Sequence, residues 1–215
     1  ELNRIGSHLV AFGTYGLDIG AFTPFFYCFR EREWMMALFE KICGARLTYS
    51  YIRIGGVFND APVGWLKEVE RFCDVFEEKW QEYYDLLAVN HIFVKRTADI
   101  GVISPEMAVD YGLTGPMLRG SGVDFDLRRD VPYMAYDEIC KAGVFDIPLG
   151  TGEKGTVGDC WDRVYVRLQE MMESIKIKSR TLSSLALAKS RSLCSTFALT
   201  KICLRSNSSP RLACN

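Results

Sequence analysis

The sequence has 215 residues, of which 48% are hydrophobic and 25% are charged, and its formal net charge is −1. This composition excludes a disordered or collagen-like chain and is typical of one globular domain with a sizeable core. No run of about 18 apolar residues occurs, so we expect any contact with a membrane to be made through partner subunits.

The small net charge hides an uneven distribution. Residues 178–215 contain seven basic residues and no acidic one, whereas residues 1–177 contain 19 basic and 27 acidic residues. A basic tail often binds nucleic acid or a membrane. This tail is rich in Ser and Leu, has Phe197 as its only aromatic residue and lacks an amphipathic stripe. No nucleic-acid partner is therefore predicted.

The eight cysteines argue against a metal site within the chain. None forms a C-x-x-C pair, and none lies at zinc-finger spacing from His8 or His91. We expect reduced, mostly buried thiols.

Helices are predicted along most of the chain. The first covers residues 1–19, and its apolar residues recur at spacings of three and four, namely Leu2, Ile5, Leu9 and Phe12. Gly6 and Gly13 weaken its helix propensity but permit another backbone to come close. For the second helix, Thr23 is the expected N-cap and Pro24 the first helical residue. Gly44 should end this helix.

The rest of the chain alternates between helices and loops. Residues 47–58 read as extended, and a long amphipathic helix is predicted over 63–89. Ser104 should cap a short helix. The other predicted segments are loops over 112–133, a glycine-rich surface excursion over 141–158, and a last helix over 159–177. The pattern predicts a mainly α fold with minor β structure.

Two histidines are candidates for chemistry. His8 lies one turn after Arg4 on the first helix, where it is either a titrating group beside a redox centre or a hydrogen-bonded core residue, and the pattern alone favours the second role. His91 follows Asn90 at the end of the long helix, where a cation suits the helix dipole, so a structural role is expected.

The loop carboxylates are expected to be structural. Asp124 and Asp126 share a loop with three arginines, Arg119, Arg128 and Arg129, so an ion-pair network is expected there rather than acid–base catalysis. No phosphate-binding glycine loop and no serine nucleophile motif is present.

Eight stretches across the first 177 residues form a recognisable set, namely residues 1–9, 20–26, 29–33, 44–57, 96–102, 112–122, 126–128 and 158–174. In order and spacing they resemble the 49-kilodalton-type (D) subunit family of respiratory complex I, the NADH:quinone oxidoreductase. The resemblance implies the core of a hydrogenase large-subunit-like fold, truncated at both ends.

It also implies a function as a peripheral-arm subunit. Such a subunit shapes the quinone site beside the terminal iron–sulfur cluster and couples electron transfer to proton translocation. The implied partners are the other peripheral-arm subunits, above all the one that holds the terminal [4Fe–4S] cluster, while FMN and NADH bind elsewhere and no cofactor binds this chain alone. The implied location is peripheral, on the cytoplasmic face of a bacterial plasma membrane or the matrix face of the mitochondrial inner membrane.

Four residues match family positions. His8 corresponds to a histidine beside the terminal cluster that acts as a redox-linked proton site. Arg4 corresponds to an arginine of structural weight, and Arg119 and Arg128 correspond to loop positions for which we expect a structural role. No metal ligand is implied.

The sequence also departs from the family pattern. The quinone-pocket histidine, tyrosine and aspartate of the family lie upstream of the matched stretches, and the H-R-G-x-E-K motif is missing. We therefore expect a partial helical core over residues 1–177, followed over 178–215 by an aberrant or disordered tail that is read out of frame or results from a gene-boundary artefact. Resequencing across codon 178 would test that expectation.

Two other functions stay open. One is a large-subunit homologue of a membrane-bound hydrogenase or of a deazaflavin-dependent dehydrogenase, which C-x-x-C pairs at both ends of the complete gene would favour. The other is a non-functional truncated fragment.

Overall fold

The structure is a computed structural model that describes the backbone of residues 1–191 and the side chains of residues 1–178. The described part is mainly helical, with one two-stranded sheet, as the sequence predicts. Residues 192–215, most of the expected tail, lie outside the described residues.

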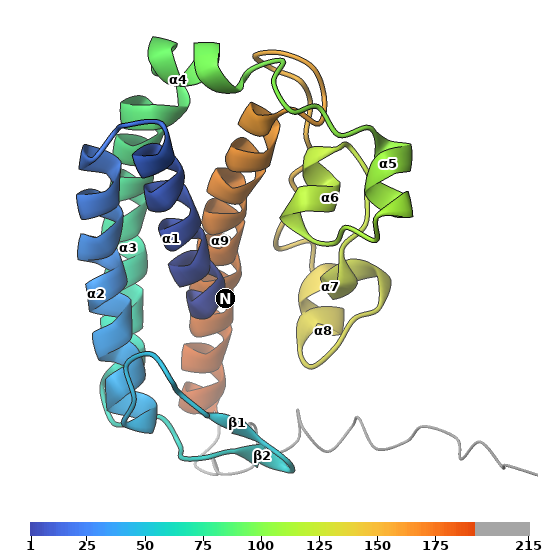
Figure 1. The fold of residues 1–215 in the computed structure, drawn as a ribbon. Coiled ribbons are helices and arrows are strands. Elements are labelled where there is room, and N and C mark those ends of the chain that lie inside the picture. Colours follow the sequence, from blue (N-terminus) through green and yellow to red (C-terminus); the bar gives the residue numbers. More distant parts are fainter. Residues whose placement is uncertain (192–215) are drawn as a thin grey trace, which may run out of the picture.

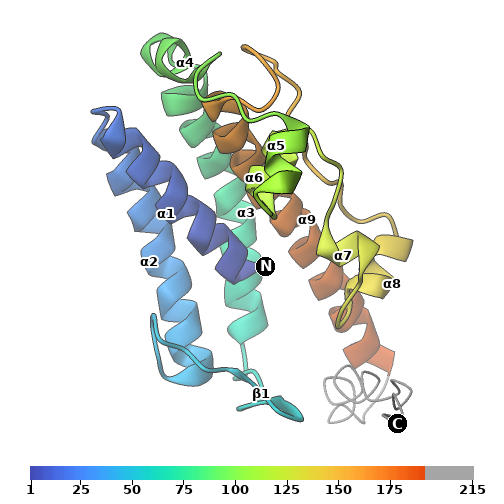
Figure 2. The same cartoon turned by 45° about the vertical axis from the view of Figure 1, so that its right-hand side comes forward.

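Four long helices form a bundle, seen side by side in Figures 1 and 2. They are α1 (Leu2–Asp18), α2 (Thr23–Cys43), α3 (Trp65–Tyr83) and α9 (Cys160–Arg191). Helix α1 packs on α2 and α9, and α3 packs on the same two helices. Each helix turns an apolar stripe to the centre, as helical periodicity requires. The buried core comes from these helices and the segment after α3, and its largest members are Trp161, Tyr83, Phe12, Phe72, Phe76 and Phe93.

Glycines on α1 allow the close contact with α2 that the sequence predicts. A Cβ atom at Gly13 would lie 3.2 Å from the Cα of Phe25, and one at Gly6 would lie 3.0 Å from the Cε of Met35. Both positions therefore permit the α2 backbone and side chains to lie against α1.

The predicted helix ends are correct in two cases and wrong in one. Gly44 ends α2 in the left-handed conformation, with φ of 76°, and Ser104 caps its helix by accepting a hydrogen bond from the Met107 amide. Thr23, however, is the first residue of α2 and not its N-cap. Phe22 occupies the cap position and no side chain bonds to the first turn, because Pro24 already removes one of the amides that a cap would serve.

The long helix predicted over 63–89 is α3 followed by one π-helical turn, η1 (Tyr84–Ala88). A short helix, α4 (His91–Thr97), comes next, and Asn90 caps it through its side chain. The expectation that His91 lies at a helix C-terminus is therefore wrong. Asn90 breaks the helix by accepting bonds from two following amides, so His91 begins a new helix and its side chain is exposed.

The segment predicted as extended contains only a small hairpin, in which β1 (Ile52–Arg53) pairs antiparallel with β2 (Gly56–Val57). Gly55 at its turn has φ of 88°, which favours glycine. In Figure 1 the hairpin lies at the end of the bundle away from α4.

Four short helices cover the other side of α9 (Figure 1). They are α5 (Pro105–Asp110), α6 (Pro116–Gly120), α7 (Leu127–Asp130) and α8 (Tyr136–Lys141). We call this part, residues 99–158, the lateral layer. None of its residues belongs to the described apolar core cluster of the bundle.

The glycine-rich segment predicted as a surface excursion is exposed over much of its length, including Thr151, Glu153 and Lys154, but its glycines at 150 and 158 are packed inward. Gly150 and Gly158 are buried, and the Gly150 amide donates to the carbonyl oxygen of Arg119 at 2.8 Å. Because glycine has no side chain, these backbone segments approach closely enough to form a direct hydrogen bond.

Helix α9 is longer than the helix predicted over 159–177, because it continues to Arg191. Ser and Leu tolerate helical geometry well enough to extend a helix that is already nucleated upstream. The out-of-frame origin of residues 178–215 stays a prediction.

Candidate functional site

A buried carboxylate on α9 brings together the residues singled out from the sequence. Glu170 has none of its surface exposed, and it lies between α1 and the lateral layer. His8 reaches it from α1 and Arg119 from α6, although 162 and 51 residues separate these side chains from Glu170 in the sequence.

Each carboxylate oxygen of Glu170 contacts a different basic side chain. His8 Nε2 lies 2.6 Å from Oε2, and Arg119 donates to Oε1. Arg4 lies one turn before His8, and its Nη1 is 3.9 Å from Oε2. His8 is 4% exposed and Arg119 3% exposed, so water screens these contacts little.

A second carboxylate extends the cluster into the lateral layer. Asp126 lies 3.2 Å from Arg119 and binds Arg128 through both oxygens, at 2.7 and 3.0 Å. Arg128 also lies 3.8 Å from Glu1, which bonds to Arg4 at 3.2 Å. The result is a buried charge cluster whose members are Glu1, Arg4, His8, Arg119, Asp126, Arg128 and Glu170.

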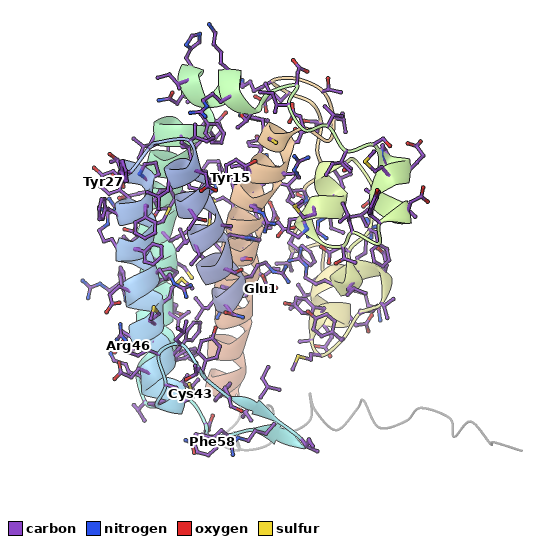
Figure 3. The ribbon with its side chains drawn as sticks, viewed as in Figure 1. Glu1, Tyr15, Tyr27, Cys43, Arg46 and Phe58 are labelled. Atoms are coloured by element: carbon purple, nitrogen blue, oxygen red, sulfur yellow. The ribbon has the colours of Figure 1, made fainter. Side chains whose placement is uncertain are left out.

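Figure 3 shows Glu1 on the side of α1 that faces α9. Its carboxylate accepts a hydrogen bond from Ser174 of α9 at 2.6 Å and another from Tyr136 of α8. Glu1, the residue before α1, thus joins the bundle to the lateral layer.

The expected ion-pair network of the arginine-rich loop is present. Arg129 pairs with Asp124 at 2.8 Å on the surface, while Arg119 and Arg128 share Asp126 in the interior. Of the three loop arginines, Arg129 is therefore exposed, while Arg119 and Arg128 are buried.

Burial and charge move the pKa values of the central pair. Desolvation lowers the pKa of His8 below its ordinary value, and the hydrogen bond to Glu170 opposes that effect without reversing it. Burial alone would raise the pKa of Glu170, but the hydrogen bond from His8 and the positive charge of Arg119 outweigh burial and lower it. Glu170 is therefore an anion at neutral pH and His8 is neutral.

These charge states fix the tautomer of His8. An ionised carboxylate can only accept hydrogen bonds, so Nε2 of His8 carries the ring proton and donates it to Glu170. Nδ1 is then the bare nitrogen. It is buried, and it has no hydrogen-bond partner within the part of the chain that the structure describes.

The sequence did not single out Glu170 as a functional residue. The apolar residues of the last helix that recur at helical spacing are Val164, Leu168, Met171, Met172 and Ile175. They predict one buried face, whereas α9 is buried on two sides. Val166, four residues before Glu170, is also fully buried and belongs to the second side. The position of Glu170 four residues after Val166 was the sequence signal that could have predicted its burial.

The described residues hold neither a metal site nor a membrane-spanning helix. No group of three or more His, Cys, Asp or Glu side chains in residues 1–178 is placed to hold a metal ion. Among the helices within residues 1–191, none is both long and apolar enough to cross a bilayer.

Comparison with known proteins decides the family. Residues 18–202 match the family described as the respiratory-chain NADH dehydrogenase, 49 Kd subunit. This chain belongs to that family. The matched range includes Arg119, Arg128 and Glu170, while Arg4 and His8 precede it.

Three relatives from this NADH dehydrogenase family cover 86% of the chain at similar identity. All three are D subunits of an NADH-quinone oxidoreductase. The chain is 50% identical to the D 2 subunit of Sorangium cellulosum, 52% identical to the D subunit of Chlorobaculum tepidum and 54% identical to the D 2 subunit of Anaeromyxobacter dehalogenans. The matched part is 47%, 45% and 48% of these proteins, so the chain spans about half the length of the relatives it matches.

Proposed function

We propose that this chain is part of a peripheral-arm subunit of NADH:quinone oxidoreductase. In that role it helps to shape the quinone site beside the terminal iron–sulfur cluster and to couple electron transfer to proton translocation. Family membership and the names of the three relatives support the assignment to this complex. The cluster, FMN and NADH would be held by other subunits, and membrane contact would be made through them.

One observation supports a specific role within that complex, namely the buried His8–Glu170 pair. A histidine held neutral at pH 7 by desolvation is ready to take up a proton when negative charge arrives nearby. One-electron reduction of an adjacent cluster supplies such a charge, and it raises the pKa of the imidazole. Proton uptake by His8 would then accompany cluster reduction.

The buried arginines suit a supporting role in this proposal. Arg4, Arg119 and Arg128 are each paired with carboxylates of the buried charge cluster. They hold α1, α6 and α7 against α9 and so keep His8 in a fixed position. No step of the electron transfer is assigned to them.

The proposal is tested by His8→Met in the full-length subunit within the assembled complex. Redox titration followed by electron paramagnetic resonance gives the midpoint potential of the terminal cluster at several pH values. We expect the potential to fall with pH in the unmodified complex, by up to about 59 mV per pH unit for a one-electron, one-proton couple. The variant should have a lower potential at neutral pH and a nearly flat pH profile, because the proton acceptor is gone.

His91→Met is the matched control, since it is the other histidine of the chain and its side chain is exposed. It should leave both the potential and its pH dependence unchanged. An unaltered pH profile in His8→Met would remove the redox-linked role from His8.

A further inference from the structure

The buried partner of His8 determines which ring nitrogen is free. Glu170 is fully buried, its Oε2 lies 2.6 Å from His8 Nε2, and its other oxygen is occupied by Arg119. The carboxylate is thus held from two sides and has no freedom to turn away from the ring. Nδ1 on the far side of the ring is buried and has no partner among the described residues.

We propose that Glu170 is a positioning residue, which keeps the proton of neutral His8 on Nε2 and leaves Nδ1 as the atom that takes up the further proton. The step is a simple protonation: the Nδ1 lone pair forms a bond to a proton from solvent, no ring bond breaks, and the ring becomes an imidazolium. Glu170 then stabilises the imidazolium through the Nε2–H bond that already exists. That this proton is linked to cluster reduction rests on the function proposed above.

Several charged groups face His8, and they do not act in the same direction. Arg4 on α1 and Arg167 on α9 lower its pKa through their positive charge, while Glu170 raises it. Arg119 on α6 reaches the ring through Glu170, and Arg32 on α2 bonds to the Gly6 carbonyl two residues before His8 in the chain. Among the groups that act directly on the pKa of His8, Glu170 is the anion. A protonated His8 therefore depends on it.

Glu170 also has a structural role, since it joins α1 to α6. A merely structural residue would change stability when replaced, but it would not set the tautomer and the pKa of one histidine. Measuring the tautomer and the pKa of His8 therefore distinguishes the positioning role of Glu170 from a purely structural one.

The test is nitrogen-15 NMR of the 215-residue chain labelled at histidine. The chain has two histidines, so exposed His91 serves as an internal reference. At pH 8 we expect the shifts of His8 to report a protonated Nε2 and a bare Nδ1. A His8 ring protonated at Nδ1 instead would overturn the proposal, and this measurement needs no variant.

Two variants that each remove one charge then test the direction of the effect. Glu170→Gln removes the anion, so the pKa of His8 should fall by about 1 to 3 units and the second tautomer should become populated. Arg119→Gln removes a neighbouring cation and leaves Glu170 in place, so the pKa of His8 should rise. This second variant keeps the test open if Glu170→Gln does not fold. A His8 pKa that neither variant moves contradicts the proposal.

Glu173→Gln is the matched control on the same helix. Glu173 is buried at 7% exposure but binds Lys176 at 2.6 Å and the Asp146 amide at 2.9 Å, and it has no contact with His8. Its replacement should leave the His8 resonances unchanged. A shift of His8 as large as that in Glu170→Gln would mean that general loosening of α9, and not the Glu170 anion, controls the ring.

A redox titration of Glu170→Gln in the assembled complex connects this result to the proposed function. The pH range over which the terminal-cluster potential changes should move to lower pH by the same amount as the His8 pKa. If His8→Met fails to flatten that profile while the NMR results hold, the proposed function fails and the role of Glu170 towards His8 stands. If the profile is flat in His8→Met but does not move in Glu170→Gln, the inference about Glu170 fails.

Discussion

His8 and Glu170 have shifted pKa values for different reasons, and each shift implies a pH dependence of stability. The folded-state pKa of His8 is below its ordinary value of about 6.5, so the unfolded chain binds a proton before the folded chain does as the pH falls. The folded-state pKa of Glu170 is also below its ordinary value, but that value is about 4.3, so its contribution is lost only in more acidic solution. The two effects occupy separate pH ranges.

The free energy of unfolding is therefore expected to decrease as the pH falls from about 6.5 towards 5, by about 1.4 kcal/mol for each unit by which folding lowers the His8 pKa. His8→Gln has no titrating ring and should remove the part of this decrease that His8 causes. Urea denaturation at pH 7 and pH 5.5 measures both free energies.

His91→Gln is the control for this prediction, because His91 is exposed and lies outside the buried charge cluster. It should retain the full decrease between pH 7 and 5.5. If the decrease remained in His8→Gln and disappeared in His91→Gln, His91 and not His8 would be its cause, which contradicts the prediction.

The backbone at Gly150, in the segment before α9, lies very close to the backbone at the end of α6. A Cβ atom added at Gly150 would lie 2.0 Å from the carbonyl oxygen of Gly120 at the end of α6. Neither atom belongs to a flexible side chain, so the contact cannot be relieved by a rotamer change. The segment before α9 and helix α6 are thus packed backbone to backbone.

Gly150→Ala should separate these two segments and destabilise the protein by about 1–3 kcal/mol, the usual cost of overpacking a close contact. Thermal or urea denaturation measures the loss. Thr151→Ala is the control at the next position, where the side chain is exposed, and it should change stability little. Equal losses in the two variants would contradict the steric explanation.

At the scale of the whole molecule, the interactions within the helical bundle differ from those that attach the lateral layer to it. The bundle of α1, α2, α3 and α9 is joined by a continuous apolar core. The lateral layer docks on α9 through the buried charge cluster and through glycine contacts instead. Polar docking is sensitive to the loss of one member, because the remaining buried charge is left without compensation.

Arg119→Met should therefore loosen the lateral layer while the bundle stays folded. It leaves Glu170 and Asp126 buried with fewer positive charges, at a cost of about 3–5 kcal/mol. Hydrogen exchange should accelerate in α6 and α7 and remain slow in the core turns of α1 and α3. Mass spectrometry of exchanged peptides measures this.

Arg129→Met is the matched control from the same loop, because Arg129 pairs with exposed Asp124 and Asp130. Exposed ion pairs contribute little to stability, so exchange should stay close to that of the unmodified chain. Faster exchange throughout the bundle in Arg119→Met would show that the lateral layer and the bundle unfold as one unit.

The long helices were predictable from the sequence because helical periodicity is local. The spacing of Leu2, Ile5 and Leu9 describes one face of α1 whatever packs against it, and Gly44 ends α2 through its own backbone preference. Local competition also explains the errors near Thr23 and His91, where Pro24 and Asn90 changed the helix boundary by a residue or two. Sequence patterns locate such boundaries less well than they locate helices.

Of the candidate site, the sequence identified His8 and the arginines but not their common partner. Amphipathic patterns and family-like motifs, both local properties of the chain, are enough to predict a mainly α protein and to select Arg4, His8, Arg119 and Arg128. Only the tertiary structure places Glu170 between His8 and Arg119, since Glu170 lies 162 residues from His8 in the sequence and its helix is buried on two sides. A carboxylate in a helix looks like a solvated group until packing removes the water, and the same packing gives this pair its shifted pKa values.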